Sequence, residues 1–410
     1  MHIRNTLIII CFLAILSSCQ KNPLQLAMKR AGENSTELQK VLDHYSINES
    51  DSLKYKAAVF LIENMEYHFG VEQTIYQNGQ VTDEFSWGKE NMLHSLKTEN
   101  VKEKRNQIIN QTIDSLGITI QRGEALWDIE YITSDLLIEN INYAFKAWEM
   151  PWSKHLTFSD FCEYILPYRC QTEPLTQWRK YFFDKYSWIK DSLPSDCKPL
   201  SACTFLKDQL KQQLIYSNRH RTFYRGYLPP HFFENVGIGT CENLASYTSL
   251  IMRSIGIPVL YDKALYWANS DVGHVFNWVV TNDSIAGYHF GIVDGIPRRI
   301  LKNFGKVIRN TYQNHENPLW KLFVKGNLVV PSLCGINQKD VTHLHCQTDT
   351  LVMSIKENDP KAQLYYLCQI GKNGELKALN YSAVDNQKKL HFTNTTTPYV
   401  YILEHTTKGI

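Results

Sequence analysis

The stretch GIGTCENLASYTSLIMRSIGIP, residues Gly237 to Pro258, decides the fold of this chain. Its larger apolar residues recur three or four positions apart: Leu244, Tyr247, Ile251 and Ile255. This spacing predicts a helix over residues 242–255 with one buried face, ended by Gly256 and Pro258. Cys241 then stands at the helix N-terminus, where unpaired amides and the helix dipole stabilise a thiolate. A protein can make a thiol usable near neutral pH in this way.

Two apolar runs downstream supply partners for this thiol. Residues 274–280 alternate in character and predict a strand, and residues 288–293 predict a second strand that ends at Asp294. An antiparallel hairpin of these runs has its centre at Ser284, since (274 + 294)/2 = 284. That register places His274 opposite Asp294, with their Cβ atoms roughly 5 Å apart. Cys241, His274 and Asp294 then form a nucleophile, a base and an orienting acid.

These motifs resemble the transglutaminase-like superfamily. The resemblance rests on Gly-x-Gly-Thr-Cys at 237–241, Arg-Ser-Ile-Gly-Ile-Pro at 253–258, Gly273-His274 and Val-Asp-Gly at 293–295. The closest group is the transglutaminase-like domain of large bacterial lipoproteins, which residues 161–169 and 173–175 and the tail after residues 340–342 also resemble. The resemblance implies a papain-like core, in which the cysteine of a central helix packs against a sheet that carries the histidine and the aspartate.

The resemblance also implies roles for single residues. Cys241 is expected to be the nucleophile, His274 the general base and acid, and Asp294 the orienter of the imidazole. The expected reaction is cleavage or transfer at an amide carbonyl, with a peptide, protein or glycopeptide as substrate. Hydrolysis is the preferred outcome, because water is abundant and the sequence shows no evident site for a second amine. No cofactor is expected.

Each of these residues also has an ordinary structural interpretation. A free cysteine is often a small buried apolar residue, a strand histidine can simply be packed, and Asp-Gly is a common turn dipeptide. Asp262 and Asp271 compete with Asp294 as orienters. The alternative function is therefore a non-catalytic transglutaminase-fold module that binds a glycan or a peptide.

Candidate substrate-binding residues lie near the expected triad. Papain-like enzymes complete the oxyanion hole with the cysteine amide and an upstream side chain, but residues 221–240 contain no Gln or Trp. Tyr224 and Tyr227 are the remaining donors of this kind, and Tyr227 precedes the rigid pair Pro229-Pro230. Proximity in sequence adds three further candidates, which are Trp267, Asn269 and Asn277. The backbone amide of Cys241 is the safer donor to an oxyanion.

The N-terminus predicts export. Residues 1–18 carry Arg4, then an apolar run from Leu7 to Leu16 that is too short to span a bilayer and suits a signal peptide. Leu-Ser-Ser-Cys at 16–19 matches a bacterial lipobox, so Cys19 is the expected lipidation site. We expect a lipoprotein that faces the periplasm or lies at the outer membrane, with its N-terminal lipid as its membrane contact.

Composition limits the range of partners. The net charge of +2 argues against nucleic acid as a partner. No Cys-x-x-Cys or His-x-x-x-His spacing occurs, so no metal site is predicted. Cys197 and Cys203 are close enough in sequence to close a small disulfide loop in an exported protein, although pairing does not follow from sequence. The sequence does not decide the oligomeric state.

The predicted fold class is α+β, a papain-like transglutaminase core with a helical region before it and a small β-sandwich after it. The expected divisions are a signal peptide at 1–18, an N-terminal helical region at 19–200, the core at 201–330 and the sandwich at 331–410. An apolar stripe at Ala58, Leu61, Ile62, Met65 and Phe69 and a polar stretch at 97–111 both predict helices. From about Thr348 the apolar period changes to two, which predicts strands.

Overall fold

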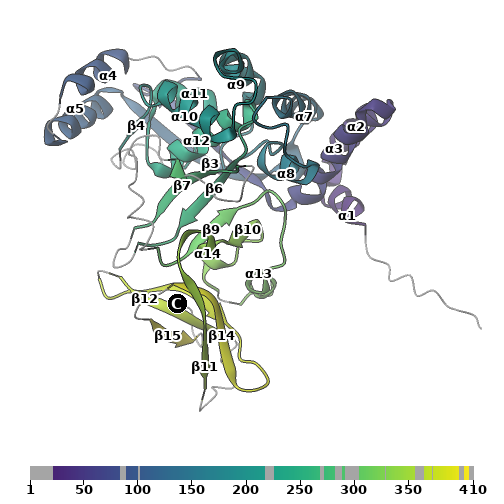
Figure 1. Ribbon diagram of the computed structural model, residues 1–410, viewed down its shortest axis with the longest axis vertical. Helices are drawn as coiled ribbons and strands as arrows, with labels where there is room; N and C mark the ends of the chain where they lie inside the picture. The colour runs from purple at the N-terminus through teal and green to yellow at the C-terminus, as the bar shows by residue number, and fades with distance from the viewer. Residues whose placement is uncertain are drawn as a thin grey trace, which may run out of the picture.

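The computed structural model describes residues 22–83, 89–99, 102–217, 226–267, 272–281, 289–290, 304–327, 329–355, 364–371, 373–396 and 401–405. The helices gather at one end of the molecule and the C-terminal strands at the other, with a five-stranded antiparallel sheet between them (Figure 1). The protein is thus a mixed structure in which helices combine with several antiparallel sheets, as the α+β prediction requires.

The N-terminal region begins with helices packed around one apolar cluster that includes Leu38, Leu61 and Ile141. These helices are α1 (Pro23–Arg30), α2 (Ser35–Ser46), α3 (Ser52–Asn64), α6 (Asp128–Tyr131), α7 (Ser134–Trp148) and α8 (Phe158–Tyr164). The predicted stripe is helical as far as Ile62 in α3, but Phe69 begins a strand. The helix ends because Met65–Tyr67 tighten into a 3₁₀ turn.

The same region also contains a sheet, which the prediction of an N-terminal helical region missed. Its strands are β1 (Phe69–Gln77), β2 (Gln80–Val81) and β3 (Ile118–Trp127), in the order β2-β1-β3. Two helices, α4 (Lys89–Thr98) and α5 (Lys102–Ser115), lie between β2 and β3 in the chain and project together in Figure 1. The solvated helix predicted over 97–111 is therefore two shorter helices, and Leu96 and Ile109 are buried in the main core.

The central layer of the fold is the sheet β10-β9-β6-β7-β8, in which every described neighbour pair is antiparallel. Its strands are β6 (Val259–Ala264), β7 (His274–Val279), β8 (His289–Phe290), β9 (Val307–Asn310) and β10 (Gln338–Asp340). The elements that precede it are α9 (Trp178–Tyr186), α10 (Pro199–Leu210), β4 (Ile215–Tyr216), α11 (Pro230–Val236), β5 (Ile238–Gly239) and α12 (Cys241–Ser254). Helix α12 confirms the predicted helix within one residue at either end.

Alternation along β7 separates its side chains onto two faces. Val275 and Asn277 face α12, since Val275 packs with Ala245 of that helix and Asn277 donates to the carbonyl of Ala245. Phe276 and Trp278 face the other way and share an apolar cluster with Val307 of β9 and Val341, which follows β10. The core sheet is therefore covered by α12 on one face and by more C-terminal segments on the other.

The C-terminal segment is built of strands, as the change of period predicts. Strands β11 (Thr348–Ser354) and β14 (Lys389–Thr396) pair with each other, and β12 (Tyr365–Ile370) lies between β13 (Leu376–Ser382) and β15 (Ile402–His405). Leu367 of β12 shares an apolar cluster with Phe392 of β14, so the two sheets pack face to face. Two short helices, α13 (Pro318–Phe323) and α14 (Thr342–His345), precede the strands.

The eight described cysteines are free thiols, so the loop that a Cys197–Cys203 disulfide would close is not formed here. Both cysteines belong to the same apolar cluster, and the sulfur of Cys197 lies 3.5 Å from the carbonyl of Lys198. Within the described residues, no helix combines the length and the apolar character needed to cross a bilayer.

A buried arginine joins several of the helices. The side chain of Arg179 on α9 is 2% exposed and donates to Asn140 Oδ1 of α7 at 2.6 Å and to the carbonyl of Arg253 on α12 at 3.1 Å. Its remaining nitrogen donates to three carbonyls just after α8, those of Ile165, Leu166 and Pro167. These acceptors include the C-terminal ends of two helices, where carbonyl groups otherwise lack partners.

We expect Arg179→Met to lower the free energy of unfolding by about 3–5 kcal/mol, because it leaves several buried carbonyls without a donor. Lys180→Met is the matched control, since Lys180 is the next residue of α9 and makes an exposed ion pair with Asp184. Urea denaturation followed by tryptophan fluorescence measures both variants. Equal stability of the two variants would show that Arg179 does not hold the helices together.

Candidate active site

Cys241 is the first residue of α12, as the sequence predicts, and the helix start is capped. Thr240 and Asn243 form a reciprocal capping box, in which the Thr240 amide donates to Asn243 Oδ1 at 3.1 Å. Asn243 Nδ2 also donates to the carbonyl of Gly226 at 2.7 Å, which ties the helix start to the segment before α11. The half-buried Cys241 packs against a small cluster formed by Ala245, Tyr261 and Val275.

His274 is the first residue of β7, next to Val275. Helix α12 and strand β7 run in the same direction, because Cys241 packs near Val275 while Ala245 and Ser249, further along the helix, contact Asn277. Cys241 and His274 therefore lie at the same end of the layer that the helix and strand form. The imidazole itself stacks on Phe276, with ring centroids 5.8 Å apart, so the ring is directed toward the sheet face opposite α12.

Burial determines the charge of His274. Desolvation lowers the pKa of the imidazole to about 4, so the ring is neutral at pH 7 and able to accept a proton. Its Nε2 atom is buried and has no hydrogen-bond partner within the described part of the chain. A buried ring nitrogen without a hydrogen bond costs free energy, so a hydrogen-bond partner for this atom is expected.

Asp294, the expected orienter, lies outside the described residues, as do Asp271, Asn269 and Cys19. The strand register beside it differs from the prediction. Asn277 pairs with Phe290 and Trp278 with His289, whereas a centre at Ser284 requires Asn277 opposite Gly291. The prediction was wrong by one residue because it aligned His274 with Asp294, whereas the turn between the strands sets the register of a hairpin.

Asp262, the competing orienter, has other partners. It is fully buried on β6, accepts two 2.7 Å hydrogen bonds from Arg309 and lies 2.9 Å from Nε2 of His345. Hydrogen bonds and charges from Arg309 and His345 outweigh desolvation and lower the pKa of the Asp262 carboxyl. The structure thus places Asp262 in an ion-pair network that connects β6, β9 and α14.

The structure separates the described substrate-binding candidates. Trp267 lies beside His274, with ring centroids 5.7 Å apart, and its ring also packs on Phe304. Tyr227 is on the α12 side, where its hydroxyl is 3.2 Å from that of Tyr261 and burial raises its pKa well above the ordinary value. Asn277 is 0% exposed and is bonded to α12, so the prediction that it contacts substrate is not supported by its position.

Two further residues near Cys241 carried no local sequence signal. Cys170 packs against the same Ala245–Tyr261–Val275 cluster, although it lies in the loop between α8 and α9. Burial raises the pKa of its thiol, which argues against a second nucleophile. Lys263 forms a 3.4 Å ion pair with Glu242, the residue after Cys241, in a position where both side chains remain partly exposed. Alternation along β6 accounts for both Tyr261 and Lys263 facing α12.

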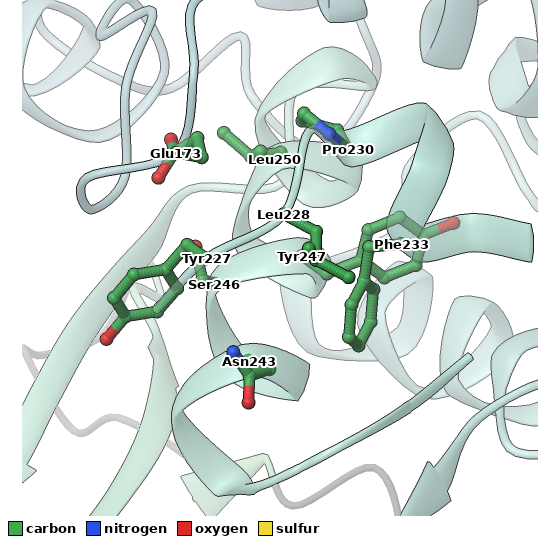
Figure 2. A pocket seen from close by; sticks show the side chains of 9 residues that line it. All are labelled: Glu173, Tyr227, Leu228, Pro230, Phe233, Asn243, Ser246, Tyr247 and Leu250. Atoms are coloured by element: carbon green, nitrogen blue, oxygen red, sulfur yellow. The ribbon is translucent and has the colours of Figure 1, made fainter. Parts of the chain in front are cut away.

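A small cavity of about 10 Å³ lies against α12, with room for about one water molecule. Its lining includes Glu173, Tyr227, Asn243 and Ser246, and Figure 2 shows Asn243 in the first turn of the helix below Tyr227 and Tyr247. Cys241 does not line it. Within the described residues, no group of three His, Cys, Asp or Glu side chains is placed to hold a metal ion.

The pKa of His274 predicts a pH-dependent contribution to stability. Its folded-state pKa of about 4 lies below the ordinary 6.5, so between these values only the unfolded chain binds a proton there. The stability of the folded protein is unaffected above pH 6.5 and falls by up to about 3 kcal/mol as the pH drops to 4. His274→Gln should remove this part of the pH dependence. Denaturant unfolding of the wild type and of His274→Gln at several pH values measures this difference. If the free energy of unfolding of the two proteins depended on pH in the same way, the prediction would be contradicted.

Comparison with known proteins gives little further guidance. No family model matches the chain, and no curated protein matches it. Among solved structures, a protein described as a "Putative Cysteine Protease from Cytophaga hutchinsonii" is similar over 33% of this chain and 42% of that chain. The two are 12% identical and superpose with a TM-score of 0.25. A similarity at this level carries no argument for fold or activity, so the geometry of the site has to support any proposal.

Proposed function

We propose that this protein is a transglutaminase-like cysteine hydrolase or acyltransferase with a papain-like core, acting on amide bonds of peptides, proteins or glycopeptides. The observation that carries the proposal is that α12 and β7 begin at the same end of the layer that they form. Cys241, on the first turn of the helix, packs against the cluster to which Val275 belongs, and His274 is the residue before Val275 in the strand. Nucleophilic acyl transfer requires a thiol at a helix N-terminus and a neutral imidazole within reach of it. The shared end of α12 and β7 supplies both residues.

The chemistry follows from these positions. His274 takes the proton of the Cys241 thiol as the sulfur attacks the amide carbonyl carbon, and the Cys241 amide donates to the developing oxyanion. His274 then protonates the leaving amine as the C–N bond breaks, which leaves a thioester on Cys241. Water, activated by the same imidazole, releases the acid and restores the thiol. An amine in place of water would give transfer, and we favour water because it is abundant.

Asp294 is our proposed orienter of His274, although β7 and β8 pair one residue away from the register that set the two residues opposite each other. A neutral imidazole carries one N–H and one acceptor nitrogen, and the buried Nε2 of His274 lacks a partner among the described residues. The carboxylate of Asp294 would accept a hydrogen bond from the Nε2–H group. Nδ1 would then be free to accept the proton of the Cys241 thiol. The same contact would favour the protonated ring and so oppose the desolvation that lowers the pKa.

One observation favours the alternative of a non-catalytic module that binds a glycan or a peptide. The ring of His274 stacks on Phe276 and near Trp267, on the sheet face opposite α12. The catalytic arrangement needs one ring nitrogen of His274 within about 4 Å of the Cys241 sulfur. For this, the ring has to turn from the aromatic stack toward the helix side of the sheet. An imidazole that stays in the aromatic stack would serve packing alone.

Reactivity of Cys241 decides between the enzyme and the binding module. We expect iodoacetamide to label Cys241 at pH 6–7 at least about tenfold faster in the wild type than in His274→Ala, because the imidazole removes the thiol proton. Peptide mass spectrometry measures the rate, and Cys170→Ala is the control, since Cys170 packs against the same cluster but is not part of the mechanism. Equal, slow labelling of Cys241 in wild type and His274→Ala would favour the binding module.

We also propose that the chain is exported and anchored through a lipid on Cys19. Helix α1 begins at Pro23, so only residues 20–22 would separate the anchored cysteine from the folded body. In a bacterial host, Cys19→Ser should block lipid attachment and move the protein from the detergent phase to the aqueous phase on Triton X-114 partition. Unchanged partition of Cys19→Ser would contradict the lipid anchor and leave the enzymatic proposal intact.

A further inference from the structure

The layer between α12 and β7 contains one buried carboxamide among apolar side chains. On the helix-facing side of β7, the residues on either side of Asn277 are Val275 and Val279, which are 4% and 0% exposed. Asn277 is itself 0% exposed. A buried amide costs free energy unless it is hydrogen-bonded, so its presence in this layer has to be explained by what it bonds.

Asn277 bonds α12 at two points. Its Nδ2 atom donates to the carbonyl of Ala245 at 3.0 Å and to the hydroxyl of Ser249 at 2.7 Å. The Ser249 hydroxyl in turn donates to the Ala245 carbonyl at 2.8 Å, so the three groups form a closed cycle. Ala245 lies one helical turn beyond Cys241, and Asn277 lies three residues beyond His274. The cycle is therefore a polar link between α12 and β7 that lies close in the chain to both proposed catalytic residues.

We infer that Asn277 is a positioning residue, which fixes the register of β7 against α12 and thereby the separation of Cys241 and His274. This inference rests on the proposed function. Apolar contacts between the helix and strand are tolerant of sliding, whereas a bidentate amide is satisfied in one register only. A shift of one strand residue is about 3.3 Å, which is enough to take a thiol out of reach of an imidazole.

A structural role and a positioning role predict different outcomes for Asn277→Leu. Leucine has a similar volume, and after the change Ser249 still donates to Ala245, so no donor on the helix is left without a partner. The buried Oδ1 of Asn277, which has no partner within the described residues, is removed as well. Replacement of a buried polar group by an apolar isostere is often close to neutral for stability. We therefore expect the thermal midpoint to change little while reactivity is lost.

The test is a double-mutant cycle of Asn277→Leu and His274→Ala, with the iodoacetamide labelling rate of Cys241 as the readout. We expect His274→Ala to slow labelling at least about tenfold in the wild-type background and less than about twofold in the Asn277→Leu background, because the imidazole no longer reaches the thiol. Thr248→Val is the matched control. Thr248 is buried in the same helix turn and donates to the carbonyl of Leu244 in its own helix, and among the described residues its side chain makes no hydrogen bond to β7.

The outcomes separate the two proposals. If His274→Ala has no effect even in the wild-type background, the proposed function fails. If it has its full effect in both backgrounds, the function stands and Asn277 is not a positioning residue. Should Asn277→Leu fail to fold, Ser249→Ala removes one of the two bonds, and unaltered labelling with unaltered dependence on His274 in that variant would also overturn the inference.

Asn277→Asp adds a readout that a purely structural role would not produce. The side chain is isosteric, and when protonated it can donate to Ala245 in place of the amide, but when ionised it faces a carbonyl oxygen and repels it. Burial favours the protonated form. Labelling relative to the wild type should therefore be largest at low pH and fall as the pH rises. A ratio that does not depend on pH would count against positioning.

Discussion

The guanidinium of Arg179 is the interaction on which the helical half of the structure depends. It is buried, and its hydrogen-bond acceptors among the described residues are backbone carbonyls and the Asn140 amide, with no carboxylate. Desolvation accordingly lowers its pKa well below the ordinary value. A cation is stable here because the carbonyls after α8 and near the end of α12 carry the negative ends of two helix dipoles. The same bonds hold α12 by its C-terminus, at the far end from Cys241.

A second buried arginine, Arg253, connects α12 to the segment that packs near the Cys241 thiol. Arg253 of α12 donates to the carbonyl of Arg169 at 2.8 Å, and Arg169 forms a buried bidentate ion pair with Asp128, with both distances 2.6 Å. The loop that follows Arg169 folds back on itself, because Glu173 accepts from the amides of Cys170 and Gln171. Cys170 is thereby held against the cluster on which Cys241 packs. The segments 161–169 and 173–175, which carry part of the family resemblance, supply much of this network.

The sequence predicted those parts of the site that local pattern determines. Apolar spacing placed α12 and hence Cys241 at its N-terminus, and alternation placed β7 with His274 as its first residue. The pairing of β7 with β8 was wrong by one residue, since register depends on the turn and not on the chemistry of the residues that face each other. The sheet formed by β1 and β3 was missed because most residues of β3 are exposed and the two strands carry weak apolar alternation. Contacts such as those of Cys170 join residues far apart in the chain, and no local pattern reports them.

The assignment of Asn277 shows why residue type alone misleads. An amide near a predicted histidine suggests substrate binding, but burial and two bonds to α12 give it a different position. The physical difference lies in alternation: residues 275 and 277 face the helix, whereas residues 274 and 276 face away from it. Alternation along β7 thus puts Asn277 against the helix and His274 on the outer face.

The environment of His274 sets opposing demands on the proposed reaction. A general base has to be neutral at the working pH, and burial beside Trp267 and Phe276 ensures this by lowering the pKa to about 4. A ring with so low a pKa is a weak base, however, and it would take a proton from a thiol reluctantly. A carboxylate at Nε2, which has no partner among the described residues, would raise the pKa and strengthen the base. Substrate that excludes water from the thiol would lower the pKa instead. The reactivity of Cys241 thus depends on the pKa of His274. Burial in the aromatic stack lowers that pKa, and a carboxylate bonded to Nε2 would raise it.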